Sequence, residues 1–338
     1  MNWGIIGLGS MAKKFAVSIK DLNDTRLLAV SSNSFFKRKK FGFKFNIKNK
    51  YQFKNDGGIF NCDEINNIYI ASTNNFHFDL ISKAIASKKN ILCEKPLTID
   101  YKDALIVKKK LSNSKVFFME AIAYRTHPLI KLVIQKIQDN TIGKVLKIYT
   151  SFGFAVKKIN KNNRLFNKEL GGGAILDVGC YPVSMSNLIA GIDNNDEILL
   201  PKISEVSGSF YETGVDDSAY ATLNYKNGIK SRIKISIKES MDNKTIIEGS
   251  EGKILIPNPW LPARVSFIEI IKNGKSHYID IKSKFDLFAG QINIVNELIK
   301  KGELESKYPS MSWASSVNNM LILDEWKNLL KKKYENIK

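Results

Sequence analysis

Short apolar runs alternate with amphipathic stretches over the first 120 residues of the chain. We expect strands buried on both faces at 3–8, 27–32, 68–72, 90–93 and 116–119. Apolar residues recur at helical spacing at 11–20, 76–87 and 101–111. This alternation of strand and helix predicts an α/β domain over 1–120, a doubly wound parallel sheet of the Rossmann type.

The pattern changes to short alternating strands beyond residue 143, after a predicted helix at 128–139. Strands are expected at 145–154, 204–210, 219–225, 229–237, 244–248, 253–256 and 265–272, and helices at 175–188, 288–301 and 313–332. Turn residues such as Asn227-Gly228 and Asn273-Gly274 separate several of these strands. We therefore predict a second, α+β domain over 121–338, built on a mostly antiparallel sheet.

The charge is strongly positive, with 52 Lys and Arg against 33 Asp and Glu and a formal net charge of +19. Only six of the basic residues are Arg, and the lysines are spread over the whole chain. Nucleic-acid recognition favours Arg forks beside stacking aromatics, so we expect no nucleic-acid partner. The electrostatic field of this positive net charge is still expected to attract anions such as a phosphorylated cofactor.

Further classes are disfavoured by what the chain lacks. No apolar run approaches the roughly 20 residues that a membrane span needs, and the first residues enter a strand without the basic start of a signal peptide. Cys62, Cys93 and Cys180 show no CxxC spacing, so neither a metal site nor a disulfide framework is expected. We predict a cytoplasmic protein with no membrane partner and no bound metal.

A glycine-rich turn follows the first predicted strand and opens a helix. Gly7 permits a tight turn, Gly9 lets the backbone approach a pyrophosphate, and Ala12 is small enough for close packing of helix on strand. Ser10 and Met11 complete the loop, and the helix N-terminus then faces the negative charge. This order predicts a dinucleotide site, although a Rossmann-like turn without a nucleotide is the structural alternative.

The residues at the end of the second predicted strand indicate whether NADP or NAD would bind. No acidic residue stands there to bind the ribose hydroxyls of NAD. The segment instead offers groups that could bind a 2′-phosphate, namely Ser32, Asn33, Ser34, Lys37 and Arg38. We predict NADP, with NAD as the alternative cofactor, and Lys37 and Arg38 simply starting a solvated helix as the structural alternative.

A lysine ends the predicted strand at 90–93, in the sequence Glu94-Lys95-Pro96. Ligands of doubly wound sheets bind at the carboxyl ends of strands, which places Lys95 and Glu94 near the cofactor. A partly desolvated Lys beside a nicotinamide has a lowered pKa and can exchange a proton with a substrate hydroxyl. The alternative is an exposed Lys paired with Glu94.

Three glycines at 171–173 precede a predicted helix that carries Asp177 and Tyr181. Residues at i and i+4 share one helix face, so a carboxylate and a phenol are expected to lie together. Such a pair could hold a diol and relay a proton. A capping Asp and a packed Tyr are the structural alternative.

Together these motifs resemble the glucose–fructose oxidoreductase / inositol dehydrogenase (Gfo/Idh/MocA) family over essentially the whole chain. The segments Tyr124–Pro128, Pro259-Trp260 and Met311–Ala314 resemble the branch of NADP-linked D-xylose and dimeric dihydrodiol dehydrogenases. The resemblance implies a Rossmann domain and an open-faced sheet domain whose sheets pair into homodimers or homotetramers.

The same resemblance implies roles for individual residues. Lys95 is then the catalytic Lys, and Tyr181 takes the place of the family's usual His as general acid/base with Asp177 as its partner. Ser72, Thr73, Asn75 and His77 would lie beside the nicotinamide, and Arg125 and His127 would contact substrate. Two departures matter: Asn74 replaces a usual Pro, and Ala123 stands where dihydrodiol enzymes usually have a Trp, which favours a sugar over an aromatic diol.

We therefore predict an NAD(P)-dependent oxidoreductase that transfers a hydride between the nicotinamide and a sugar or polyol-like hydroxyl or carbonyl. Tyr181 or Lys95 takes the proton, and Asp177 orients the pair. Two alternatives remain open: a reductase of another carbonyl, an imine or a nucleotide-linked sugar on the same site, and an NADP-binding sensor without turnover.

Overall fold

The computed structural model describes residues 1–157, 160–161, 163–192 and 199–335. The chain forms two compact units. The first comprises Met1–Thr98, Lys102–Thr126 and Lys284–Trp313, and the second comprises Ile99–Tyr101, His127–Ser283 and Ala314–Lys338. A late segment of the chain therefore groups with the N-terminal part, and the bounds 1–120 and 121–338 stay a prediction.

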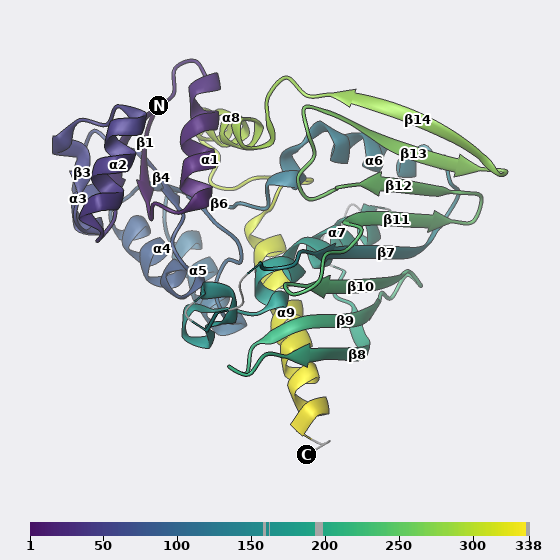
Figure 1. Cartoon of the computed structure of the whole chain (residues 1–338). Helices are drawn as coiled ribbons and strands as arrows, with labels where there is room; N and C mark the ends of the chain where they lie inside the picture. Colours follow the sequence, from purple (N-terminus) through teal and green to yellow (C-terminus); the bar gives the residue numbers. More distant parts are fainter. Residues whose placement is uncertain (158–159, 162, 193–198, 336–338) are drawn as a thin grey trace. The chain divides into compact units, whose positions relative to one another are not determined.

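The first unit is built on a six-stranded parallel sheet in the order β3-β2-β1-β4-β5-β6 (Figure 1). Its strands are β1 (Asn2–Ile6), β2 (Arg26–Ser31), β3 (Gln52–Phe53), β4 (Asn67–Ile70), β5 (Asn90–Cys93) and β6 (Phe118–Glu120). The strand order reverses between β1 and β4, and ligands of such sheets bind at this reversal.

Helices of the first unit connect the strands and bury their apolar faces. They are α1 (Ser10–Ser18), α2 (Phe35–Phe45), α3 (Asp56–Phe60), α4 (His77–Ala86), α5 (Tyr101–Ser112) and, from late in the chain, α8 (Leu287–Lys300). The late helix is fastened to the sheet by a hydrogen bond from Trp3 Nε1 to Asn296 Oδ1, 3.1 Å long and buried. This bond explains why residues after 284 belong to the first unit.

The second unit is built on an eight-stranded sheet in the order β14-β13-β12-β11-β7-β10-β9-β8, antiparallel except between β7 and β10. Its strands are β7 (Val145–Gly153), β8 (Lys202–Phe210), β9 (Asp216–Asn224), β10 (Lys230–Ser236), β11 (Lys244–Gly249), β12 (Lys253–Pro257), β13 (Val265–Lys272) and β14 (Lys275–Lys282). Together with the parallel sheet, this confirms the predicted fold class.

The helices of the second unit pack against this sheet: α6 (Pro128–Gln138) contacts β13 and β14, and α7 (Cys180–Ala190) contacts β7 and β10. The C-terminal α9 (Trp313–Glu335) contributes the fully buried Trp326. A π-helix, η7 (Ile175–Gly179), precedes α7. Among the described residues, no helix is both long and apolar enough to cross a membrane.

Short 3-10 turns link the larger elements. They are η1 (Ile19–Asp21), η2 (Asn49–Tyr51), η3 (Asn74–Phe76), η4 (Ala123–Thr126), η5 (Arg164–Phe166) and η6 (Lys168–Leu170).

A helix around Lys37 and Arg38 was expected only as the structural alternative, and the structure has α2 there. Three further elements were not predicted: α3, β3 and β14. The last of these, β14, is exposed along most of its length, so its side chains show no alternation of apolar and polar positions. The two residues of β3 are too few to show any period.

Candidate active site

The turn after β1 fits the predicted phosphate loop. Gly7 has φ +87°, and a β-carbon there would lie 2.6 Å from the carbonyl oxygen of Ala71. Its N–H donates to Ser31 O at 3.1 Å, which joins the turn to β2. Gly9 precedes α1 as its N-cap, and a β-carbon built on Gly9 meets no atom within 4 Å. Gly7 is thus required by the fold, whereas Gly9 leaves open space at a helix N-terminus suited to a phosphate.

Polar side chains gather after β2, where a 2′-phosphate is predicted to bind. Ser32 and Ser34 are half-buried, and Asn33 and Lys37 are exposed. Ser34 Oγ accepts the N–H of Lys37 at 3.3 Å and so caps α2. These groups form an open, donor-rich edge, which fits the phosphate group of NADP.

Arg38 differs from the solvated helix residue that the structural alternative describes. It is buried, its Nη1 donates to Ser32 O, and its guanidinium lies 5.8 Å from the centre of the Phe35 ring. Arg38 therefore fixes the shape of the 32–35 turn, while Lys37 supplies the exposed charge.

The segment after β4 is tied to the turn that carries Lys95. His77 is fully buried, and its Nδ1 lies 2.8 Å from Pro96 O. A carbonyl oxygen only accepts, so Nδ1 carries the proton and donates. Thr73 Oγ1 donates to Asn75 Oδ1 at 2.7 Å, and Ser72 Oγ donates to Thr73 O at 3.3 Å. The structure thus gives His77 a holding role next to Lys95, and its contact with the nicotinamide stays a prediction.

The turn after β5 is fixed on both of its sides. The hydroxyl of Tyr69 donates to Glu94, which is buried. On the other side of the turn, the N–H of Leu97 donates to Glu120 Oε1 at 2.9 Å. Lys95 stands between these two anchors and is half-buried. The structure therefore holds a half-buried ammonium on a fixed turn at the carboxyl end of β5.

Asp177 and Tyr181 belong to the second unit, at the junction of η7 and α7. The sequence predicts an ordinary helix, but Ile175–Gly179 is a π-helix, a form that often marks functional positions. Asp177 is buried and accepts a hydrogen bond and ion pair from Arg164 Nη1 at 3.0 Å. This pair fixes the carboxylate one turn before Tyr181.

Aromatic rings surround Tyr181, which is itself half-buried. The rings of Phe152 and Trp260 lie 5.2 and 6.0 Å from that of Tyr181, centre to centre. They stack on each other at 5.7 Å, and Trp260 Nε1 donates to Ser151 O at 2.9 Å. These contacts restrict the phenol ring to one orientation.

The two predicted substrate residues on the segment after β6 both make internal contacts. Arg125 is buried, and its Nε donates to Pro309 O within the first unit. His127, in the second unit, accepts the N–H of Leu129 on Nδ1 at 3.2 Å and caps α6. Burial lowers the pKa of His127, against the opposing effect of a hydrogen bond with the backbone of Ala263. Their contact with substrate stays a prediction.

In the first unit, the structure brings the predicted dinucleotide residues to the carboxyl ends of β1, β2, β4 and β5. It brings Asp177 and Tyr181 together in the second. Arg164 and Asp216 were not among the predicted site residues. Arg164 had a signal, because it is one of only six arginines in the chain. Among the described residues, no three His, Cys, Asp or Glu side chains gather as metal ligands.

Family models match both parts of the chain. The model of the oxidoreductase family with an NAD-binding Rossmann fold (GFO/IDH/MocA) matches residues 1–121, and the GFO/IDH/MocA C-terminal domain matches 130–255. Trans-1,2-dihydrobenzene-1,2-diol dehydrogenase of Xenopus tropicalis is 30% identical over 335 residues, 96% of each chain. The enzyme of the same name from Homo sapiens is 24% identical over 331 residues, 95% of each chain.

Solved structures show the same fold at lower identity. A 3-ketoreductase from Actinomadura kijaniata, in complex with NADP and TDP-benzene, superposes with a TM-score of 0.85 at 20% identity over 96% of each chain. An aldose–aldose oxidoreductase from Caulobacter crescentus, complexed with glycerol, gives a TM-score of 0.86 at 18% identity over 98% of each chain.

We expect the two glycines of the phosphate loop to respond differently to alanine. Gly7→Ala places a β-carbon against backbone at a positive φ, so its free energy of unfolding should fall by about 1–3 kcal/mol. Gly9→Ala meets no protein atom, so it should unfold like the parent while its Kd for NADPH rises about tenfold or more, because the methyl group occupies the space of the pyrophosphate. Urea unfolding and fluorescence titration with NADPH measure the two effects, and unchanged NADPH affinity in Gly9→Ala would contradict the assignment.

Proposed function

The chain belongs to the Gfo/Idh/MocA family of oxidoreductases and is an NAD(P)-dependent dehydrogenase, and from this premise we propose that it interconverts a hydroxyl and a carbonyl group of a sugar or polyol with NADP as cofactor. The observation that carries the proposal is the fixed Glu94-Lys95-Pro96 turn, which places a half-buried ammonium at the carboxyl end of β5.

The residues of the first unit fit a bound dinucleotide. Gly7, Gly9, Ser10, Met11 and Ala12 form the turn and first helical residues that would hold the pyrophosphate. The 2′-phosphate would be bound by Ser32, Asn33, Ser34, Lys37 and Arg38, and the nicotinamide half by Ser72, Thr73, Asn75, His77, Glu94 and Lys95. The preference for NADP is supported by the absence of an acidic residue in 30–38.

When bound, the nicotinamide accepts or returns the hydride of the carbinol carbon. The protein's part is to move the proton of the substrate oxygen and to orient the substrate. We assign the proton to Tyr181 or Lys95, and the orientation of the phenol to Asp177. The Arg164 ion pair holds Asp177 in place, and the rings of Phe152 and Trp260 hold Tyr181.

A sugar is favoured over an aromatic diol at the segment after β6. Ala123, buried in η4, provides no large ring against which an aromatic substrate could stack. Arg125 and His127 lie within four residues of Ala123, and we assign them to substrate contact from there. The aldose-linked name of one structural neighbour agrees with this substrate class.

We also propose a homodimer or homotetramer formed through the antiparallel sheet, in the cytoplasm. Large apolar side chains are exposed on its strands β7, β13 and β14, namely Leu146, Val265, Phe267 and Tyr278. The rings of Phe267 and Tyr278 contact each other at 5.7 Å across β13 and β14, and exposed apolar side chains gathered on a sheet are typical of an interface. The cytoplasmic location is supported by the three cysteines, all of which are free thiols.

Lys95→Met and Tyr181→Phe should each lower kcat about 10²–10⁴-fold, because each removes a group that exchanges a proton at the substrate oxygen. The Kd for NADPH should stay within about threefold in Tyr181→Phe, since Tyr181 is not among the residues assigned to the dinucleotide. Steady-state rates with a panel of aldoses, polyols and carbonyl compounds measure the effect.

The matched controls are Lys275→Met, at an exposed position on β14, and Tyr334→Phe, at a half-buried position on α9. Near-normal turnover in both Lys95→Met and Tyr181→Phe would overturn the assignment. NADPH that binds the parent but never reacts with any compound of the panel would instead support a sensor without turnover.

For the cofactor, NADPH should bind more tightly than NADH. Lys37→Ala should weaken NADPH binding about tenfold and leave NADH binding unchanged, because one charge-assisted hydrogen bond to the phosphate is lost. Lys40→Ala, an exposed lysine later on α2, is the control. Titrations with both cofactors test this, and equal affinities of the parent for the two would count against NADP.

A further inference from the structure

The first residue of β9 places a buried carboxylate against the segment that carries Asp177 and Tyr181. Asp216 is 4% exposed, and its Oδ2 accepts the N–H of Ile175 at 2.6 Å. Ile175 is the first residue of the π-helix η7. A carboxylate that accepts a backbone N–H forms a short, strong hydrogen bond, so β9 holds η7 at its start.

The glycine before this helix is shaped to the same carboxylate. Gly173 has φ +115°, and a β-carbon on it would lie only 2.5 Å from Asp216 Oδ1. The N–H of Gly173 donates to Leu165 O, and the N–H of Asp177 donates to Gly173 O at 3.0 Å. The missing side chain therefore lets Asp216 reach Ile175, two residues before the candidate catalytic Asp177.

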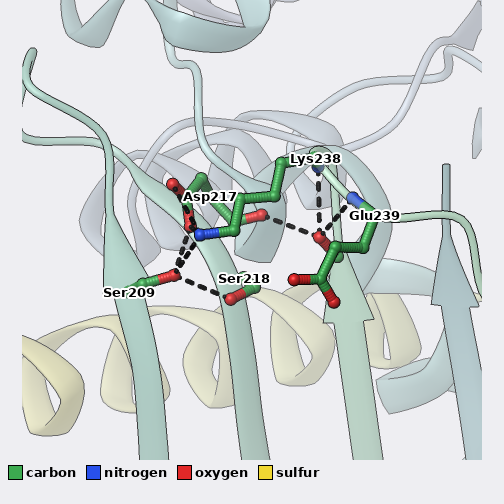
Figure 2. Close-up of polar contacts among 6 residues, drawn as sticks. Ser209, Asp217, Ser218, Lys238 and Glu239 are labelled. Atoms are coloured by element: carbon green, nitrogen blue, oxygen red, sulfur yellow. Dashed lines mark hydrogen bonds and ion pairs between the residues drawn. The ribbon is translucent and has the colours of Figure 1, made fainter. Parts of the chain in front are cut away.

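The next residue, Asp217, has the same burial but different partners. It is 5% exposed and forms an ion pair with Lys238, whose Nζ lies 3.4 Å from its Oδ1. Ser209 Oγ also donates to its carboxylate. Figure 2 shows Lys238 and Ser209 converging on Asp217, across β8, β9 and the end of β10. The cluster around Asp217 therefore joins strands to one another. Of these two carboxylates, that of Asp216 bonds to η7, so Asp217 serves as the comparison for Asp216.

We propose that Asp216 is a positioning residue: by accepting the Ile175 N–H, it fixes the start of the π-helix and with it Asp177 and Tyr181. The inference rests on the proposed function for its catalytic meaning, but the hold on η7 is a separate, measurable property. We expect the attachment of η7 to β9 to depend on an acceptor oxygen at position 216 and to strengthen when that oxygen carries a negative charge.

The charge on Asp216 changes near neutral pH. Burial raises its pKa from 3.8 to about 7, against the opposing effects of the Ile175 N–H, its own backbone N–H and Lys327 of α9; Asp217 raises it further. Nearby, Asp177 is paired with Arg164, and Asp217 is paired with Lys238.

Because the folded-state pKa is above the unfolded one, Asp216 stabilises the fold at acid pH and loses that contribution as the pH rises from about 4 to about 7. Above pH 7 the anion binds the Ile175 N–H more strongly. Protection of the η7 amides against hydrogen exchange should therefore increase as the pH rises through 7. The contribution of Asp216 to the free energy of unfolding of the whole protein decreases at the same time.

The experiment measures amide hydrogen exchange of residues 171–181, corrected for intrinsic rates, together with kcat and the Kd for NADPH, in the full chain between pH 6 and 8. In Asp216→Ala we expect exchange of this segment to rise about tenfold or more and kcat to fall about tenfold, with the NADPH Kd unchanged. Asp216→Asn keeps an acceptor of the same shape, so it should restore most of the protection and of kcat but remove the change near pH 7.

Asp217→Asn is the matched control and should leave exchange at 171–181 at the parent level. Equal exchange in Asp216→Ala and the parent would overturn the proposal, as would equal increases in the Asp216→Ala and Asp217→Asn variants. If Asp216→Ala does not fold, Asp216→Asn decides the question, since a pH response like that of the parent would overturn the proposal. Full turnover by both Lys95→Met and Tyr181→Phe would overturn the proposed function alone, because the exchange data test the role of Asp216 independently of turnover.

Discussion

Close approaches of backbone to its surroundings, each permitted by a missing β-carbon, place the functional groups of both units. In the first unit, Gly7 lies so near Ala71 O that a methyl group would be 2.6 Å from it. This contact joins the turn after β1 to the end of β4, where the strand order reverses. The opening of α1 is thereby directed to the place where doubly wound sheets bind ligands.

The second unit has two such close approaches, at the neighbouring residues Gly172 and Gly173. A β-carbon on Gly172 would lie 2.6 Å from Leu165 O, and one on Gly173 would meet the carboxylate of Asp216. The first contact keeps the Arg164 segment beside the helix start, and the second admits the acceptor of the Ile175 N–H. The Arg164–Asp177 ion pair therefore depends on positions that carry no side chain at all.

What the sequence could reveal depends on how local each feature is. The phosphate loop, the Lys95 turn and the Asp177–Tyr181 pair each lie within a dozen residues, so motif and period were enough to propose them. Asp216 and Arg164 act through partners 41 and 13 residues away, and no local pattern reports such pairings. The π-helix was missed for a related reason, since its backbone is set by contacts with β9 and the 164–167 turn rather than by its own side chains.

The abundance of lysine gives the few arginines a diagnostic value. The guanidinium is a planar fork of fixed donors, whereas the ammonium is a strongly hydrated point charge. On a solvated surface the two are interchangeable, whereas the fork suits a donor that must be directed. The buried Arg38 and Arg125 donate to Ser32 O and Pro309 O, and the exposed Arg164 donates to the buried carboxylate of Asp177. In a chain with a net charge of +19, the presence of a charge therefore says little about function, and the geometry that holds it in place says much more.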